Sequence, residues 1–160
     1  NGQPIAITGS RDNTARTWDL NTGQPIGPPL TDHTGPVVAV AALVLPNGQP
    51  TAITGSSDNT VRIWDLDTGQ PIGAPLTDHT NPVVAVTALV LPNGQPIAIT
   101  GSADGTVRMW DLARGGAMAY PVLHMPGGVQ ALAVNTSGDW PVAVVAGDGL
   151  MAVTLPLEEP

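Results

Sequence analysis

The chain alternates short apolar runs with polar turns, and its pattern is extended rather than helical. Val83 to Leu91 is rich in β-branched residues and nearly continuous in apolarity, which is typical of a strand buried on both faces. Three further extended segments complete each unit, represented by Pro50–Ser56, Val61–Leu66 and Pro71–Leu76. Turns rich in Pro, Asn, Gly and Asp separate them. Because proline is confined to strand edges, we expect the last segment to be the outer, exposed strand.

This unit recurs along the chain. Residues 1–46 reappear as 47–92 with eight differences in 46 positions, and a third copy begins at residue 93. A fourth, weaker copy keeps 139–147 in the phase of 93–101, then loses two residues and has Thr154 near the tryptophan position. Such a period indicates a solenoid, a propeller or an array. Four antiparallel strands, running from most apolar to most polar, describe one propeller blade from axis to rim.

Composition narrows the classes of protein that fit this pattern. The formal charge is −8 and the five cations include no Lys, so we expect no binding to nucleic acid or to an anionic membrane. The absence of cysteine excludes disulfides, thiolate catalysis and Cys-type zinc sites. Three scattered histidines and single turn carboxylates predict no metal ion and no cofactor. No signal peptide is visible at the start and no apolar run could span a bilayer, so we expect a cytoplasmic protein.

A ten-residue motif gives the repeat its closest resemblance. Ser-x-Asp-x-Thr-x-Arg-x-Trp-Asp occurs at Ser10 to Asp19, Ser56 to Asp65 and Ser102 to Asp111. Two units also carry Asp-His, at Asp32-His33 and Asp78-His79, which is close to the Gly-His pair of WD repeats. These residues resemble the WD-repeat family of β-propellers, in a bacterial type with near-identical 46-residue repeats. The resemblance implies an all-β fold of four-stranded antiparallel blades, about 3.5 of them in this chain.

The resemblance also implies that a structural hydrogen-bond network ties each blade together. Such a network would satisfy the buried polar groups of Trp, Ser, His and Asp mutually. Its members would be His33, Ser56, Asp58 and Trp64, then His79, Ser102, Asp104 and Trp110, with Ser10, Asp12 and Trp18 in the first copy.

The same Ser, His and Asp could be read as a hydrolase triad. We favour the structural interpretation, because a nucleophile would not recur identically at every blade beside a tryptophan. The first copy has no preceding histidine, and in the fourth copy His124 falls one residue out of phase. We therefore expect both end blades to be held less firmly.

Three arginines stand two residues before the tryptophans, at Arg16, Arg62 and Arg108. They could form an anion-binding ring, or each could pair with a nearby aspartate and keep its head in solvent. The charge of −8 favours the paired interpretation, since it gives anions little reason to approach.

Residues that differ between near-identical copies mark candidate contacts with a partner. Trp140 breaks the repeat at a position where other copies have Gly, and it either packs over a weak blade edge or anchors a contact; we favour packing. The other candidate positions, at loop tips on a rigid frame, are Arg11, Gly35, Ser57, Asn81 and Ala103.

These observations predict one partial propeller over residues 1–160. We expect blade 1 over 1–30 without its first strand, blade 2 over 37–76, blade 3 over 83–123 and blade 4 over 129–155 without its outer strand. Such an open arc would expose apolar sheet faces, so we expect a homo-oligomer, most simply a dimer, or a complementary propeller segment.

For function, we expect a non-catalytic scaffold or sensor that presents loops to a protein or peptide partner. The alternative is a multivalent small-molecule or glycan binder using equivalent pockets between blades. An enzyme is the third and least favoured class.

Overall fold

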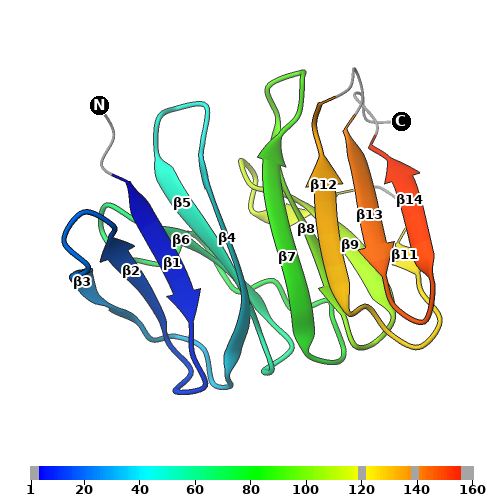
Figure 1. Ribbon diagram of the computed structural model, residues 1–160, viewed down its shortest axis with the longest axis horizontal. Helices are drawn as coiled ribbons and strands as arrows, with labels where there is room; N and C mark the ends of the chain where they lie inside the picture. Colours follow the sequence, from blue (N-terminus) through cyan, green and yellow to red (C-terminus); the bar gives the residue numbers. More distant parts are fainter. Residues whose placement is uncertain (1–3, 119–121, 138–140, 156–160) are drawn as a thin grey trace.

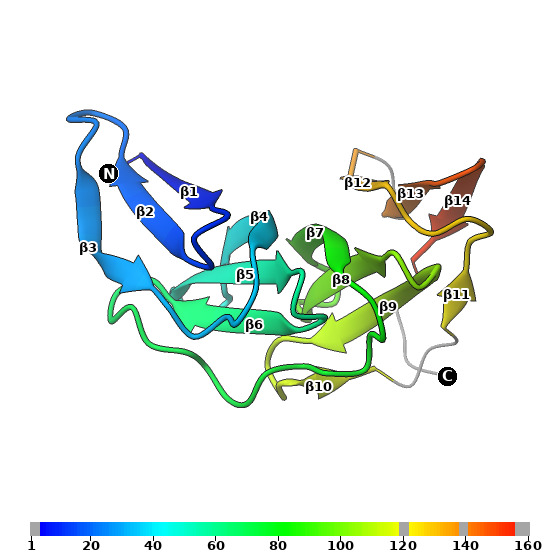
Figure 2. The ribbon, with the colours of Figure 1, turned by 90° about the horizontal axis from the view of Figure 1, so that it is seen from below.

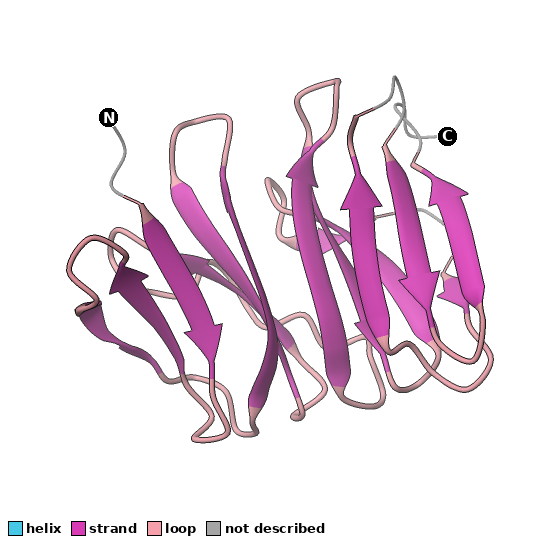
Figure 3. Cartoon of the chain, viewed as in Figure 1, coloured by secondary structure: helices cyan, strands magenta, loops and turns pink. Residues whose placement is uncertain are grey.

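The computed structural model describes residues 4–118, 122–137 and 141–155, and within them it contains strands and no helix (Figure 3). Every paired strand is antiparallel to its neighbour. The strands are β1 (Ile5–Gly9), β2 (Ala15–Asp19), β3 (Pro25–Leu30), β4 (Val37–Val44), β5 (Pro50–Ser56), β6 (Val61–Asp65), β7 (Val83–Val90), β8 (Pro96–Ser102), β9 (Thr106–Asp111), β10 (Gly116–Ala117), β11 (Leu123–His124), β12 (Ala131–Asn135), β13 (Val142–Ala146) and β14 (Leu150–Thr154).

The described strands form four sheets that stand side by side along an open arc (Figures 1 and 2). Their strand orders are β1-β2-β3, then β4-β5-β6, then β7-β8-β9-β10 with β11 also paired to β9, and finally β12-β13-β14. Figure 2 shows β1, β4, β7 and β12 on the concave side of the arc, with the later strands of each sheet towards its outside.

The turns between strands follow directly from their residues. After β4 the chain turns at Asn47-Gly48, where Gly48 has a φ of 88° and the backbone N–H of Leu45 donates to the carbonyl of Gln49 at 2.9 Å. Between β5 and β6, Asn59 takes a φ of 69°, a left-handed conformation that asparagine accepts more readily than most residues. Short loops of this kind hold consecutive strands in antiparallel register.

The expectation that the first, most apolar strand of each unit is buried on both faces is wrong. In β4, Val38 and Val44 are 49% and 62% exposed, and β7 is only partly buried. The second strand is the buried one, since β8 is buried throughout and β5 at all but its first residue. The reason is position: β4 and β7 line the concave side, whereas β5 and β8 have a strand on each edge and a neighbouring sheet over each face.

The outer strands are less regular than the sequence predicts. In the first copy, β3 is a strand with a register shift against β2. In the second copy the expected strand 71–76 touches β6 only at two isolated bridges, Val61 with Leu76 and Trp64 with Pro71. Gly73, with a φ of 72°, bends the backbone away between them. In the third copy two short strands, β10 and β11, share the outer edge of β9.

Successive sheets pack through the same pair of surfaces each time. One surface, here called the tryptophan face, carries Trp64 in the second sheet and Trp110 in the third. It packs on the opposite face of the preceding sheet, so Trp110 meets Ile53 and Ile63 of the second sheet in one buried cluster. The resulting cores lie between sheets, and burial of these apolar side chains holds the arc together.

Candidate functional site

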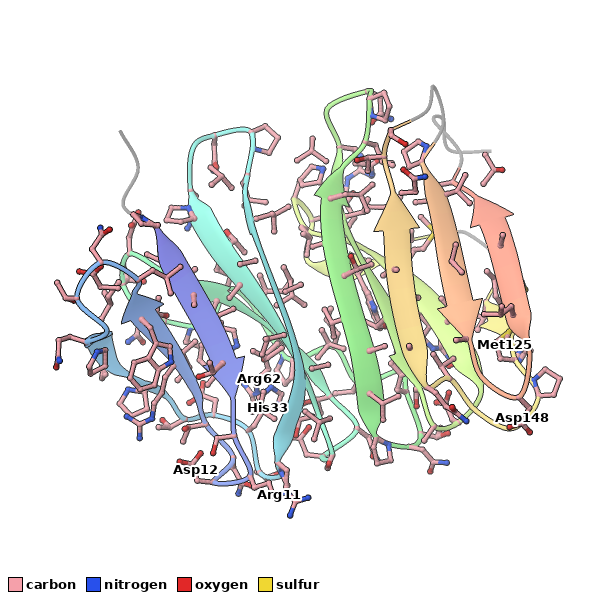
Figure 4. The ribbon with its side chains drawn as sticks, viewed as in Figure 1. Arg11, Asp12, His33, Arg62, Met125 and Asp148 are labelled. Atoms are coloured by element: carbon pink, nitrogen blue, oxygen red, sulfur yellow. The ribbon has the colours of Figure 1, made fainter. Side chains whose placement is uncertain are left out.

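The polar side chains singled out in the sequence gather at one edge of the arc. The strands β1 and β5 end there, and the turns that follow them carry Asp12 and Asp58. Figure 4 shows Arg11, Asp12, Met125 and Asp148 along this lower edge. We call it the Asp-turn edge, made of turns 10–14, 56–60, 102–105 and 147–149 with loops 31–36, 77–82 and 124–130.

In the second sheet, a chain of hydrogen bonds joins four side chains from the edge into the core. Nδ1 of His33 lies 2.8 Å from Oδ2 of Asp58, and its Nε2 lies 2.7 Å from Oγ1 of Thr54. The indole N–H of Trp64 donates to the same hydroxyl oxygen at 2.9 Å. All groups are satisfied if His33 is neutral: Nδ1–H donates to the carboxylate, and the Thr54 O–H donates to Nε2.

The third sheet repeats this arrangement. Oγ1 of Thr100 lies 2.7 Å from Nε2 of His79 and accepts the indole N–H of Trp110 at 2.8 Å. Here Nδ1 of His79 lies 3.0 Å from Oγ1 of Thr106 and 3.4 Å from Oδ2 of Asp104. The network therefore recurs with the same donors and acceptors in adjacent sheets.

The hydroxyl that joins imidazole to indole belongs to a threonine and not to the serine that we expected. Oγ of Ser56 instead donates to the carbonyl of Gly35 at 2.9 Å and accepts the backbone N–H of Asp58 at 3.1 Å. Ser102 makes the equivalent bonds. Strand alternation could have identified Thr54, because it lies two residues from Ala52, which pairs across the strands with Trp64.

The charge states of this network follow from burial and hydrogen bonding. Burial is the largest influence on His33 and His79 and lowers the pKa of each imidazole below 6.5, although the neighbouring aspartate acts in the other direction. Burial alone would raise the pKa of Asp58, but hydrogen bonds from Thr60, His33 and backbone N–H groups outweigh it and hold that pKa well below 3.8. The pKa of Asp104 is lowered in the same way.

The first copy holds only part of the network. The indole N–H of Trp18 donates to Oγ1 of Thr8 at 2.8 Å, on a surface that none of the sheets formed by the described residues covers. Asp12 accepts the N–H and O–H of Thr14, at 3.0 and 2.7 Å, and its turn is capped by Ser10. These hydrogen bonds lower the pKa of Asp12.

The fourth copy replaces the network by apolar side chains. Ala131 pairs with Ala146, whereas its counterpart Ala85 pairs with Gly101, so β13 is shifted by one residue from the phase expected from the sequence. This register puts Val145 at the place of Thr100 and Val153, not Thr154, at the place of Trp110. Buried Met125 stands at the histidine position, and it packs with Val145 in one cluster.

The hydrogen bonds of His33 do not match the Ser-His-Asp arrangement of a hydrolase triad, because the hydroxyl on its Nε2 belongs to Thr54 and not to Ser56. The side chain that contacts Nε2 of His33 is Thr54, which is 0% exposed and whose oxygen already accepts an indole N–H. Ser56 contacts no imidazole in the hydrogen bonds described above. Within the described ranges, no three His, Asp or Glu side chains gather where they could hold a metal ion.

The comparison with known families agrees with these features. The WD40 family (WD domain, G-beta repeat) matches residues 23–65 and 69–111, more than half of the chain. The chain belongs to the WD40 family. No curated protein matches this chain. Family membership and the antiparallel sheets together identify a β-propeller-type fold, as the resemblance implied.

The arginines of the two matched WD40 repeats form ion pairs. Nη1 of Arg62 lies 3.6 Å from Oδ2 of Asp32, and Nη1 of Arg108 lies 3.8 Å from Oδ2 of Asp78. The aspartate side chains are 46% and 50% exposed, but the arginine side chains are only 18% and 23% exposed, and the Nε atoms of Arg62 and Arg108 are buried without a hydrogen-bond partner. This geometry favours paired arginines over an anion-binding ring.

Four of the candidate contact residues are exposed on the Asp-turn edge: Arg11, Ser57, Asn81 and Ala103. Gly35 is only partly exposed, and a Cβ there would lie 2.9 Å from the backbone nitrogen of Asp58. Gly35 therefore packs against the turn 56–60. Trp140 lies outside the described residues. No helix in the described part of the chain is long and apolar enough to cross a membrane.

Proposed function

We propose that this chain is a non-catalytic interaction module, a WD40 propeller segment that presents its Asp-turn edge to a protein or peptide partner. The observation that carries the proposal is one backbone geometry bearing different side chains. Arg11, Ser57 and Ala103 occupy the same turn position in three copies, and all three are exposed. Different exposed side chains on a repeated frame supply what selective recognition needs.

Hydrogen bonds keep that frame the same in each copy. Asp12, Asp58 and Asp104 each accept the backbone N–H of the threonine two residues on, at 3.0, 2.9 and 2.8 Å. Each carboxylate also accepts that threonine's O–H, at 2.7, 2.7 and 2.6 Å. A turn held in this way orders its exposed residue before binding, which lowers the entropy lost on association.

The buried threonines support a role without catalysis. Thr54 and Thr100 touch an imidazole in the manner of a nucleophile, yet both are 0% exposed. A substrate would have to separate two packed sheets to reach either hydroxyl. WD40 repeats generally serve as scaffolds for protein interaction, which fits the same interpretation.

The proposal includes the blade boundaries 1–30, 37–76, 83–123 and 129–155, with four-stranded blades where the chain is complete. The bridges of Val61 with Leu76 and Trp64 with Pro71 support an outer fourth strand in the second blade. A bacterial and cytoplasmic setting is also part of the proposal, supported by a composition with no Lys and no Cys.

Selection of peptides from a displayed random library against the immobilised chain tests this function. A selected peptide should bind Arg11→Ala at least about tenfold more weakly, the size of one interface hot spot. Gln70→Ala is the matched control, since Gln70 is exposed in the hairpin after β6 at the other edge. Peptides that bind all three proteins equally would contradict a role for the Asp-turn edge.

A second candidate function rests on a groove of about 420 Å³ between the second and third sheets. Its lining includes the apolar residues Leu45, Ile72 and Leu112, which suit a small apolar ligand. The pocket between the first and second sheets measures only about 80 Å³, so these two sites are not equivalent, contrary to a multivalent binder. This second function would be favoured if the peptide selection yields no binder and if the chain binds a small apolar ligand whose binding is lost in Ile72→Arg.

A further inference from the structure

The groove between the second and third sheets lies at the edge of the arc opposite to the Asp-turn edge. The turns after β4 and β7, at the top of Figure 1, contribute to its lining. Leu112 in this lining is 4% exposed and belongs to a buried apolar cluster, against which the partly buried Leu45 and Ile72 pack. Both sheets have another sheet on either side among the described residues, so the groove is an internal junction of the arc.

A polar hollow of about 470 Å³ continues this groove along the third sheet. The groove and the hollow share Gly94, Pro96 and Ala113 in their linings. Among the described residues that line the hollow, Asp111 and Arg114 carry the charges. A ligand that spans both would therefore meet apolar side chains at one end and polar groups at the other.

The two charged residues of the hollow present different groups to a ligand. Oδ1 of Asp111 accepts the backbone N–H groups of Ala113 and Arg114 at 2.8 and 3.0 Å, and its Oδ2 accepts an N–H of Gln95 at 3.1 Å. The Asp111 side chain is 8% exposed, whereas the Arg114 side chain is 75% exposed, with its Nη1 3.5 Å from Oδ2 of Asp111. A guanidinium carries five N–H donors, so this end of the site offers donors and positive charge, which an anionic acceptor complements.

The exposed cation distinguishes this hairpin from those of the first two copies. Ala113 and Arg114 stand where the second copy has Asp67 and Thr68, although the preceding strands of the two copies match closely. The turn itself is the same, because the N–H of Ala113 and the N–H of Asp67 each donate to the aspartate two residues earlier at 2.8 Å. The exchange therefore keeps the backbone and changes the side chains that border the groove.

The apolar part of the groove has few partners for a peptide backbone. Two of its lining residues are prolines and have no N–H. Six other lining residues already donate their backbone N–H within the chain: Leu45, Gln49, Ile72, Gly94, Leu112 and Ala113. Such a lining suits a ligand whose body makes no hydrogen bonds better than an extended peptide, whose own amides need partners.

We propose that this groove binds a small aliphatic carboxylate, with its chain on Leu45, Ile72 and Leu112 and its carboxylate on Arg114. This inference rests on the second candidate function, to which it adds the head group of the ligand, and it does not depend on the Asp-turn edge. A groove of about 420 Å³ lies within the range of small-molecule sites, about 300–1,000 Å³. The charge of −8 opposes an anion at long range, but physiological salt screens exposed charges beyond about 8 Å.

Calorimetric titration with decanoate, decanol and decylammonium tests the head group, because these three probes share one aliphatic chain. Decanoate should bind at least about tenfold more tightly than decanol, since it adds a charge-assisted hydrogen bond to Arg114. Decylammonium should bind more weakly than either, because its charge repels the guanidinium. Acetate has the same head without the chain and should show no binding.

Two variants that carry the residues of the second copy test the place of binding. Arg114→Thr should weaken decanoate binding about tenfold and leave decanol binding unchanged, and Ala113→Asp should weaken decanoate at least as much by adding a carboxylate beside the guanidinium. The same turn of the second sheet holds these residues, so both variants should fold. Thr68→Arg is the matched control: it adds a guanidinium beside the pocket of about 80 Å³ and should bind decanoate as the parent does.

Four outcomes would overturn the proposal. Equal affinities for decanoate and decanol would exclude the carboxylate head and leave the second candidate function standing, whereas no binding of any probe would contradict both. Tightest binding of decylammonium, or unchanged decanoate binding by Arg114→Thr, would also overturn it. Peptide binding at the Asp-turn edge, measured on the same variants, reports separately on the main proposed function.

Discussion

Nδ1 of His33 lies 2.8 Å from Oδ2 of Asp58, a carboxylate 25 residues further along the chain. His33 belongs to the loop that leads into the second sheet, and Asp58 lies in a turn within that sheet. The same carboxylate oxygen accepts the backbone N–H of Thr34 at 2.9 Å. This contact fastens the connection between two sheets to the edge of the second, and it positions the imidazole above the core.

The hydroxyl of Thr54 should be more important to stability than its size suggests. Thr54→Val keeps the shape of the side chain but leaves the Trp64 N–H and the His33 Nε2 without their shared partner. We expect a loss of about 1–3 kcal/mol in the free energy of unfolding, measured by urea denaturation. Ser137→Ala is the control, because Ser137 and its acceptor Asn135 are both exposed and can bond to water instead. A loss there as large as at Thr54 would argue against this explanation.

Stability should fall with acid in two steps. Since the folded pKa values of His33 and His79 lie below 6.5, the unfolded chain binds more protons just below that pH, and stability decreases as the pH drops through this window. The lowered pKa values of Asp58 and Asp104 add a second loss as the pH falls below 3.8. Urea midpoints measured between pH 7.5 and 3 would show both steps.

The double variant His33→Gln, His79→Gln isolates the first step. It should be less stable than the parent at pH 7.5, yet its stability should change less between pH 7 and 5. A parent chain whose urea midpoint is constant over that range would be inconsistent with buried neutral imidazoles.

Val145 in the fourth sheet and Thr100 in the third occupy equivalent places, and we expect that exchanging valine and threonine at either place lowers the stability of the chain. Val145→Thr would bury a hydroxyl where no imidazole or indole can bond to it, at a cost of about 1–3 kcal/mol. Thr100→Val in the third sheet should cost a similar amount, because it leaves His79 and Trp110 unsatisfied. Both are measured as changes in the free energy of unfolding. If Val145→Thr proves neutral, the one-residue shift of β13 is wrong.

Gly55 should tolerate no side chain. A Cβ there would lie 2.8 Å from Cγ1 of Val83 and 2.9 Å from Cγ2 of Val86, at the point where the third sheet packs on the second. Gly55→Ala should therefore destabilise the chain by about 1–3 kcal/mol through overpacking. Gly116→Ala is the matched control, since it has open space at Cβ and an ordinary φ, and it should leave the melting temperature almost unchanged.

Local residue patterns were sufficient for much of this molecule. The 46-residue repeat, the extended segments and the turn residues predict antiparallel strands, and the second strand of the second copy begins and ends where expected, at Pro50 and Ser56. Strands and turns of this kind are local properties, because they are set by the backbone preferences of Pro, Gly, Asn and β-branched residues. The sequence also singles out His33, Asp58 and Trp64, because a motif repeated in phase stands out without any knowledge of contacts.

Contacts between segments distant in the chain decided the rest. Apolarity made the first strand of each unit look the most buried, but burial depends on what covers a strand, and β4 lines the concave side of the arc. Thr54 joins the network because pairing of β5 with β6 brings it to Trp64, which side-chain type alone does not reveal. The shift of β13 arises in the same way, since strand pairing and packing against the third sheet select the register.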